Sequence, residues 1–339
     1  MTKKRFHNVD IFKGLCLILV VIHHAPLAYM GHFALKGSFL WYINNIIISF
    51  FMPAFFVATG YCTSFKQNFR VYLWKNIKSI LIPCYGLYYL NRYLENLNVW
   101  LFEDSSWMTL SHWLAPGLKT FIEEGGFYWF LSALFIAKIL MYLLCIFQSK
   151  LTKIILSLLL MVIGTYLHQF NILPNFFFYQ HALILVSFLI FGQILKDFEI
   201  TLYRVTIITI VPFFATVFCV PIFGYEIPTI TRTIQVSLFS MPIFIFLSLS
   251  GSLIFWSISK LISESSWLEF IGRGSLVEYC FNYSTLCLVT NVFNHYLGGH
   301  ILIGDNCACL IISVVTLVIL QTFYWFLKQK YLRIILGKY

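Results

Sequence analysis

Long apolar segments alternate with short polar ones along the whole chain. Ten of them are long enough to cross the hydrocarbon core of a bilayer, which takes about 20 residues of α-helix. They lie near residues 9–30, 38–61, 76–97, 126–147, 152–170, 178–195, 203–223, 235–259, 274–296 and 303–327. No low-complexity linker separates them. The pattern therefore predicts an all-α, polytopic transmembrane helical bundle with about ten spans, formed by a single domain over residues 1–339.

The composition agrees with a membrane protein. Of the 339 residues, 60% are hydrophobic and only 11% are charged, which excludes an ordinary soluble domain. Charge and histidine interrupt the first apolar segment, and no small-residue cleavage site follows it. We therefore expect this segment to stay as the first span rather than to be removed as a signal peptide.

The basic residues predict an orientation. If the N-terminus is cytoplasmic, the inner segments hold 18 of the 23 Lys and Arg residues. The outer segments then keep only Lys36, Arg92, Lys119 and Arg232. By the positive-inside rule both termini are cytoplasmic. The net charge of +10 then reflects topology and anionic lipid of the bilayer, and we expect no nucleic-acid partner.

The first predicted span carries polar groups at membrane depth. Lys13 and His24 are eleven residues apart, almost three helical turns, so they share one stripe of the helix about 16 Å apart. His24 lies beyond the bilayer midplane, where ionisable groups usually have a function. His23 is about 100° off this stripe and is the weaker candidate. Simpler roles remain open: Asp10 as a helix cap, Lys13 snorkelling to the inner interface, and His24 bonded to a neighbouring helix.

A second group of basic residues precedes and opens the third predicted span. Lys75 and Lys78 are one helical turn apart, and Arg70 lies just before them. With Lys13 they would place four cations where two helices joined by a short connection meet the first one. Such a group suits a polyphosphate ligand. The alternative is an ordinary positive-inside loop.

Further polar candidates are spread over the rest of the chain. The hydrophilic segment from about residue 98 to 125 offers aromatic and carboxylate side chains for a sugar, or for an interfacial belt: Trp100, Glu103, Asp104, Trp107, His112, Trp113, Glu123 and Glu124. Glu278 and Lys138 are ionisable residues inside predicted spans, and they could pair. The nine cysteines show no metal-type spacing, so we expect apolar fillers and no metal site.

Several phrases together resemble one family. The opening from Arg5 through Asp10, Lys13 and Gly14 to His24 is similar to that of the acyltransferase 3 family of integral membrane acyltransferases, in which a basic residue precedes a histidine by eleven positions. Four later phrases resemble family motifs in the expected order, the first of them typical of the sugar and polysaccharide O-acetyltransferase branch: residues 51–61, 75–83, 128–135 and 270–276.

Some positions depart from the family pattern. Lysine stands at Lys13, Lys75 and Lys78, where many members carry arginine. Phe51 precedes Met-Pro where the sugar-acetylating branch often has histidine, and Asn282 stands near a point where histidine is common. These differences leave the implied reaction class intact, but because of them the resemblance says less about which acceptor is used.

The resemblance implies an acyltransferase of a bacterial plasma membrane. It implies transfer of an acyl group, in the first place acetyl from acetyl-CoA, to a hydroxyl of a cell-envelope carbohydrate that is free or lipid-linked. His24 would be the catalytic residue, and no metal takes part. The implied binding residues are, for the CoA phosphates, Lys13, Arg70, Lys75 and Lys78, and for the substrate, Trp129, Glu278 and Asn282.

The chemistry and two other function classes stay open. With an ordinary pKa of about 6.5, imidazole suits a general base near neutrality, and an acyl-histidine intermediate is the other route. An extended pantetheine arm of about 20 Å would reach from the cations to His24. A transporter or flippase of a lipid-linked sugar would predict inverted repeats, which the sequence lacks. A membrane scaffold would need neither His24 nor the basic residues.

Overall fold

The computed structural model describes residues 6–31, 37–65, 67–102, 128–197, 199–296, 304–329, 332 and 336. Within these ranges the regular elements are helices, apart from one isolated bridge between Ile230 and Ile234. In chain order they are α1 (His7–Met30), α2 (Phe39–Ile48), α3 (Phe51–Cys62), α4 (Phe69–Asn76), the π-helix η1 (Ile77–Leu81), α5 (Ile82–Phe102), α8 (Trp129–Leu144), α9 (Lys150–Gln169), the 3₁₀ turn η2 (Phe176–Phe178), α10 (Tyr179–Leu195), α11 (Glu199–Ile222), α12 (Met241–Ile262), α13 (Ser266–Arg273), α14 (Ser275–Tyr296) and α15 (Asp305–Leu327).

Each of the ten predicted apolar segments contains a helix, so the prediction of an all-α transmembrane bundle is confirmed. In the described part of the chain, seven helical segments are long and apolar enough to cross a membrane: α1, the α2–α3 pair, α9, η2 with α10, most of α11, α12 and α15. The α8 helix is shorter, and α5 and α14 contain more polar residues. The number of spans and the side on which the termini lie stay predictions.

The second predicted span is broken in the middle. Pro53 lacks an N–H group, and in an uninterrupted helix its ring would clash with the carbonyl of Ser49. The chain therefore ends α2 at Ile48 and starts α3 at Phe51. The carbonyls at the break do not stay unpaired. Thr229 donates to the carbonyl of Ile48 (2.8 Å) and Ser248 donates to that of Ser49 (3.3 Å). Side chains of other segments thus satisfy the break inside the protein.

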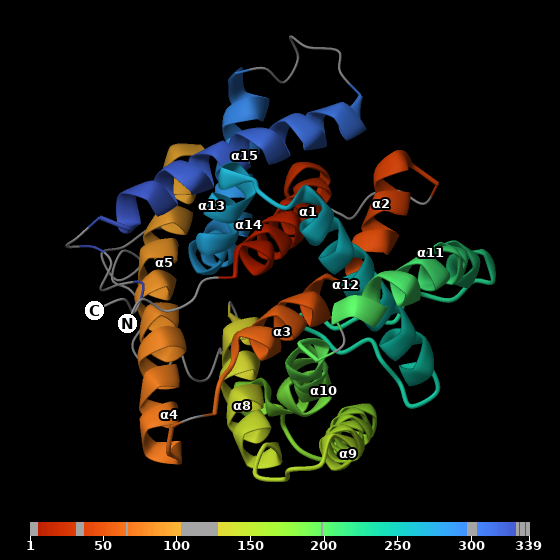
Figure 1. Ribbon diagram of the computed structural model, residues 1–339. Coiled ribbons are helices and arrows are strands. Elements are labelled where there is room, and N and C mark those ends of the chain that lie inside the picture. The colour runs from red at the N-terminus through yellow and green to blue at the C-terminus, as the bar shows by residue number, and fades with distance from the viewer. Residues whose placement is uncertain are drawn as a thin grey trace.

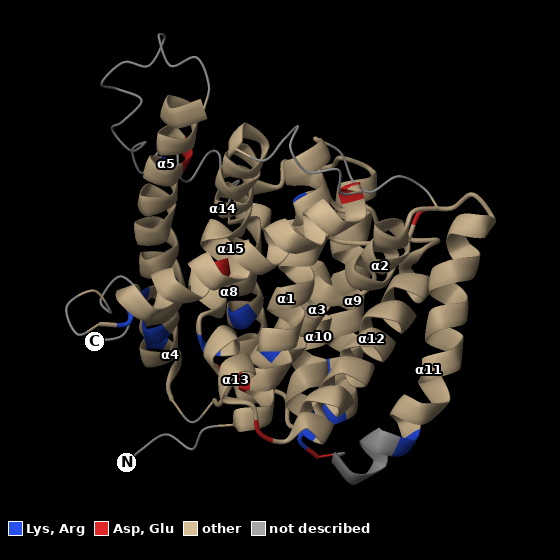
Figure 2. Cartoon of the chain, turned by 90° about the horizontal axis from the view of Figure 1, so that it is seen from above, with Lys and Arg blue, Asp and Glu red and all other residues tan. Residues whose placement is uncertain are grey.

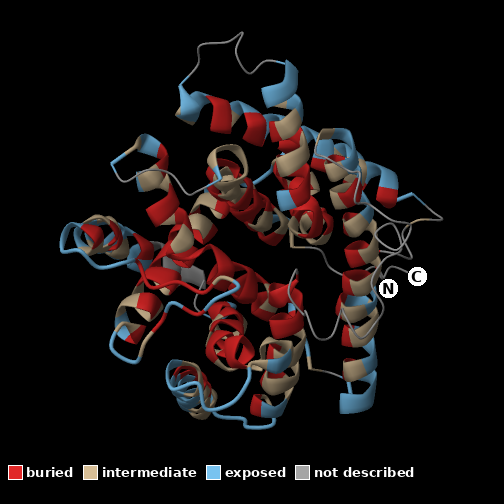
Figure 3. Cartoon of the chain, turned by 180° about the vertical axis from the view of Figure 1, so that it is seen from behind, coloured by how far each residue is buried: buried red, intermediate tan, exposed pale blue. Residues whose placement is uncertain are grey.

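The α1 helix runs through the centre of the bundle (Figure 1). It packs against α13, α14, α15, α12 and α3, whereas α4 and α5 form a column at the edge. Buried residues gather in the interior and exposed ones at the rim (Figure 3). The outer faces of α9 and α11 are rich in exposed apolar residues, which suits contact with lipid.

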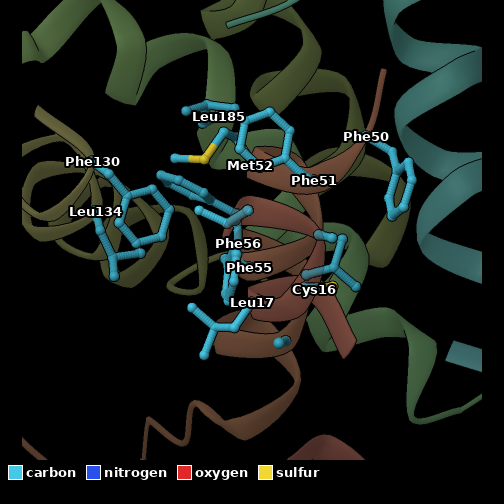
Figure 4. Packing of buried hydrophobic residues seen from close by; sticks show 14 of the residues in the cluster. Cys16, Leu17, Phe50, Phe51, Met52, Phe55, Phe56, Phe130, Leu134 and Leu185 are labelled. Carbon is cyan, nitrogen blue, oxygen red and sulfur yellow. The ribbon is translucent and has the colours of Figure 1, made fainter. Parts of the chain in front are cut away.

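An aromatic layer joins α3 to α8. The rings of Phe55 and Phe56 point toward Phe130 and Leu134 (Figure 4). The ring centroid of Phe130 lies 5.8 Å from that of Phe55 and 5.3 Å from that of Phe56, both in edge-on geometry. Such pairs stabilise beyond their burial alone. They hold the start of α8 beside the core of the bundle.

Two helix pairs approach through glycine. A Cβ on Gly60 would come within 2.0 Å of the carbonyl oxygen of Leu189, and one on Gly192 within 2.0 Å of that of Val57. The α3 and α10 backbones therefore touch at both glycines, as small residues allow in membranes. Gly272 brings α13 against α1 in the same way, because a Cβ there would lie 1.8 Å from the oxygen of Asp10.

The described Lys and Arg residues gather toward one end of the bundle, where α1 begins and where α4 and α13 lie (Figure 2). We call this the basic end. The opposite end, where α1 finishes and α2 begins, has few of them. This distribution follows the asymmetry expected from the sequence.

Candidate active site

A cavity of about 930 Å³ lies beside the second half of α1, away from Lys13. Its wall comes from α1, α2, α3, α8, α14 and the segment between α11 and α12. Aromatic rings and amides dominate this wall, including Trp41, Asn44, Asn45, Tyr128, Trp129, Gln235, Tyr279 and Asn282. Apolar walls with a few polar groups are typical of small-molecule sites.

His24 lines this cavity with one ring nitrogen left open. Its Nδ1 lies 2.8 Å from the backbone oxygen of Val20, an acceptor, so Nδ1 carries the proton and donates. Nε2 then bears a lone pair, and no described residue forms a hydrogen bond with it. An imidazole oriented by one nitrogen and open at the other has the form of a general base.

His23 lines the same cavity, although the sequence made it the weaker candidate. The ring centroids of His23 and His24 are 4.8 Å apart. His23 is only 5% exposed, and its Nδ1 lies 3.0 Å from Oδ1 of Asn44. The cavity is wide enough for both side chains to line it, although their directions around the axis of α1 differ by about 100°. Asn44 was missed in the sequence; two adjacent amides inside an apolar segment were the available signal.

Two amides in the wall leave hydrogen-bonding atoms unused. Nδ2 of Asn45 and Oδ1 of Asn282 are buried and have no partner among the described residues. Nδ2 of Asn282 lies 3.5 Å from Nδ1 of His24, so this residue stands beside the ring, and its binding of substrate stays a prediction. Buried polar atoms are nearly always paired, so unpaired ones on residues of a cavity wall suit a polar ligand or a water. A donor and an acceptor together suit hydroxyl groups, which both accept and donate.

Of the other two predicted substrate-binding residues, one lines the cavity and the other does not. Trp129 lines the cavity, and its ring lies 5.1 Å from that of His181. Glu278 is fully buried and lies outside the cavity wall, bonded to Gln321 of α15. Its partner is Gln321 rather than Lys138, whose ammonium lies 5.9 Å from the Tyr72 ring. We infer that Glu278 joins α14 to α15 and that it affects a substrate only by positioning neighbouring residues, without contacting the substrate itself.

The four predicted phosphate-binding cations are spread over separate elements. Lys13 is half-buried on α1, beside the contact with α13, whereas Arg70 and Lys75 are exposed on α4. Lys78 in η1 lies 5.3 Å from the Trp74 ring. The α4 helix packs chiefly against η1 and α8, not against α1. None of the four lines the cavity of His24. Their joint binding of phosphate stays a prediction.

The hydrophilic segment that follows α5 lies largely outside the described residues. This applies to Glu103, Asp104, Trp107, His112, Trp113, Glu123 and Glu124. Trp100 is described and exposed near the end of α5. Another segment, residues 221–235, which the sequence did not single out, provides much of the cavity wall instead.

We expect the Asn44→Ala variant to be less stable than the wild type. The substitution leaves the buried Nδ1 of His23 without its acceptor, which costs about 1–3 kcal/mol. Asn45→Ala is the matched control, because Asn45 is a neighbouring buried amide whose Nδ2 has no described partner. Thermal unfolding of the purified proteins in detergent checks this. Equal melting temperatures for the two variants would show that the His23–Asn44 bond contributes nothing.

Comparison with known proteins identifies the family. The model of the acyltransferase 3 family, described as an acyltransferase domain, matches residues 6–325. No curated protein and no solved structure gave a match. The matched range contains α1 with His24, the whole cavity wall and, apart from the last two residues of α15, the helices able to cross a membrane. The chain belongs to the acyltransferase 3 family and is a multi-pass membrane acyltransferase.

Proposed function

We propose that the protein transfers an acyl group, in the first place acetyl from acetyl-CoA, to a hydroxyl of a cell-envelope carbohydrate in a bacterial plasma membrane. One observation carries this proposal. In a cavity of about 930 Å³, the Nε2 atom of His24 is open while Nδ1 is held by Val20. The volume accommodates a sugar unit together with the end of a pantetheine arm.

The cavity wall supports a carbohydrate acceptor. The rings of Trp41 and Trp129 can cover the apolar face of a sugar. The unpaired amide atoms of Asn45 and Asn282 match hydroxyl groups. A purely apolar acceptor would leave these buried polar atoms without partners.

In the proposed transfer, the acceptor hydroxyl attacks the acyl thioester with His24 as the base. Nε2 of His24 takes the proton of the acceptor hydroxyl while its oxygen attacks the thioester carbonyl. The carbon–sulfur bond then breaks, and the leaving CoA thiolate takes the proton from the imidazolium. The products are an ester and free CoA. In the alternative route the imidazole nitrogen first accepts the acyl group itself.

The donor would approach from the basic end. The separation of Lys13 and His24 along α1, about 16 Å, is within the reach of an extended pantetheine arm of about 20 Å. Lys13, Arg70, Lys75 and Lys78 are the candidates to hold the CoA phosphates. The described cavity wall does not reach these cations, so this part of the proposal needs its own test.

Mass spectrometry of cell-envelope glycans, with and without the protein, tests the proposal. We expect the loss of an alkali-labile mass of about 42 Da per modified sugar, the mass of an added acetyl group. A transporter or flippase would instead alter the amount or the location of a glycan and leave its mass unchanged. Glycan movement that persists without acetyl-CoA would contradict the transferase.

A further inference from the structure

The segment that connects α11 to α12 folds back into the interior of the bundle instead of projecting from its surface. Residues 227–230 of this segment are buried, and Thr229 bonds to the break between α2 and α3. Pro221, Gly224 and much of the stretch up to Gln235 line the cavity of His24. The segment is therefore part of the site, and its side chains contact whatever enters.

Two histidines hold this segment in place. Nε2 of His181 lies 3.1 Å from the backbone oxygen of Thr231, and Nε2 of His168 lies 3.0 Å from that of Ile234. His181 is 1% exposed, and its Nδ1 lies 2.9 Å from Nδ2 of Asn175. Because the amide donates to Nδ1, the proton sits on Nε2 and is donated to Thr231. The residue after Thr231 is thus positioned before any ligand binds.

That residue is Arg232, which lines the cavity with an exposed side chain. Its guanidinium has no ion pair or hydrogen bond with another described residue. Glu226 also lines the cavity, and the two form no ion pair. Arg232 lines the same cavity as the second half of α1, whereas the basic end lies where α1 begins, so the general charge asymmetry does not explain it. Its planar fork of donors matches a carboxylate or a phosphate.

We propose that the acceptor carries an anionic group, a carboxylate or a phosphate, and that Arg232 binds it. This inference rests on the proposed function and narrows the acceptor to an acidic glycan. The segment 221–235 then determines specificity, because it presents the one guanidinium among the described residues of the cavity wall. Arg232 acts in binding, whereas His24 acts on the proton.

Binding by protein in lipid nanodiscs tests this, with His24→Ala in every sample so that no turnover interferes. The probes are a disaccharide containing glucuronate, its neutral counterpart with glucose in that place, and glucose 1-phosphate, each measured by titration calorimetry. We expect at least one acidic probe to bind about tenfold or more tightly than the neutral one. Arg232→Gln should remove this preference and Arg232→Lys should keep part of it. The control Arg204→Gln, an exposed arginine outside the cavity wall, should leave the preference unchanged.

Equal binding of acidic and neutral probes would overturn the proposal. An equal loss of binding of all three probes in Arg232→Gln would also overturn it, because that result indicates a structural role of the segment. The two acidic probes separate a carboxylate from a phosphate. If acyl transfer is found without this preference, only the inference about the acceptor fails. If the preference is found without transfer, the proposed function fails instead.

Discussion

The His24→Ala variant is expected to fold normally and to lose acyl transfer by about 10²- to 10⁴-fold, the range that a positioned general base contributes. The variant keeps the helix, because alanine is a good helix former and the hydrogen bond of the ring goes to Val20 of the same helix. Substrate binding should survive, since most of the wall is untouched. The rate of ester formation with purified protein in vesicles measures the loss.

His7→Ala is the matched control for this variant. His7 stands on the same helix, but its side chain is 62% exposed and pairs with Glu269 at the basic end. We expect it to keep wild-type transfer. His23→Ala distinguishes the roles of the two cavity histidines. If the ring of His23 were the catalytic one, His23→Ala would be inactive and His24→Ala would stay active. That outcome would reverse our assignment.

The second large effect concerns the contact between α3 and α10. In the Gly192→Ala variant the new methyl group would lie 2.0 Å from the carbonyl oxygen of Val57, which is backbone and cannot turn away. The two helices must separate, and this loosens the aromatic layer on α3 as well. Overpacking of this kind costs about 1–3 kcal/mol or more. We expect a clear drop in folded yield and in melting temperature.

Gly304→Ala is the control, because nothing lies within 4 Å of a Cβ at that position and its φ of −65° suits alanine. Gly60→Ala should behave like Gly192→Ala, since it meets the carbonyl oxygen of Leu189 from the other helix. Wild-type melting of both core variants would show that the helices do not approach as closely as described.

The helices were predictable because each apolar run must satisfy its backbone internally in lipid. The breaks were harder to foresee. The segment 38–61 reads as one span, and its division depends on Pro53 together with the partners Thr229 and Ser248, which come from far along the chain. A sequence pattern records the proline but not the distant donors that make a break tolerable.

The sequence supplied candidate residues for the site but not the packing that brings them together. His24, Trp129 and Asn282 lie on three different helices, and only their packing brings them into one wall. Asn44 had a signal in the sequence, the pair of adjacent amides, whereas the role of the segment around Arg232 arises from packing between remote segments. Helical spacing along α1 also says nothing about where α4 packs, so it could not show that α4 packs chiefly against η1 and α8.

An affinity label tests most directly whether the acyl end of CoA reaches His24. Bromoacetyl-CoA presents a reactive CH₂–Br group where acetyl-CoA has its methyl group, and Nε2 of a nearby imidazole displaces bromide to form a stable bond. The Cys280→Ala background removes the thiol that lines the cavity. Mass spectrometry of peptides then locates the label. We predict modification of His24 that excess acetyl-CoA prevents. Labelling that leaves His24 unmodified and appears only at other residues would contradict an acyl-transfer site at this ring.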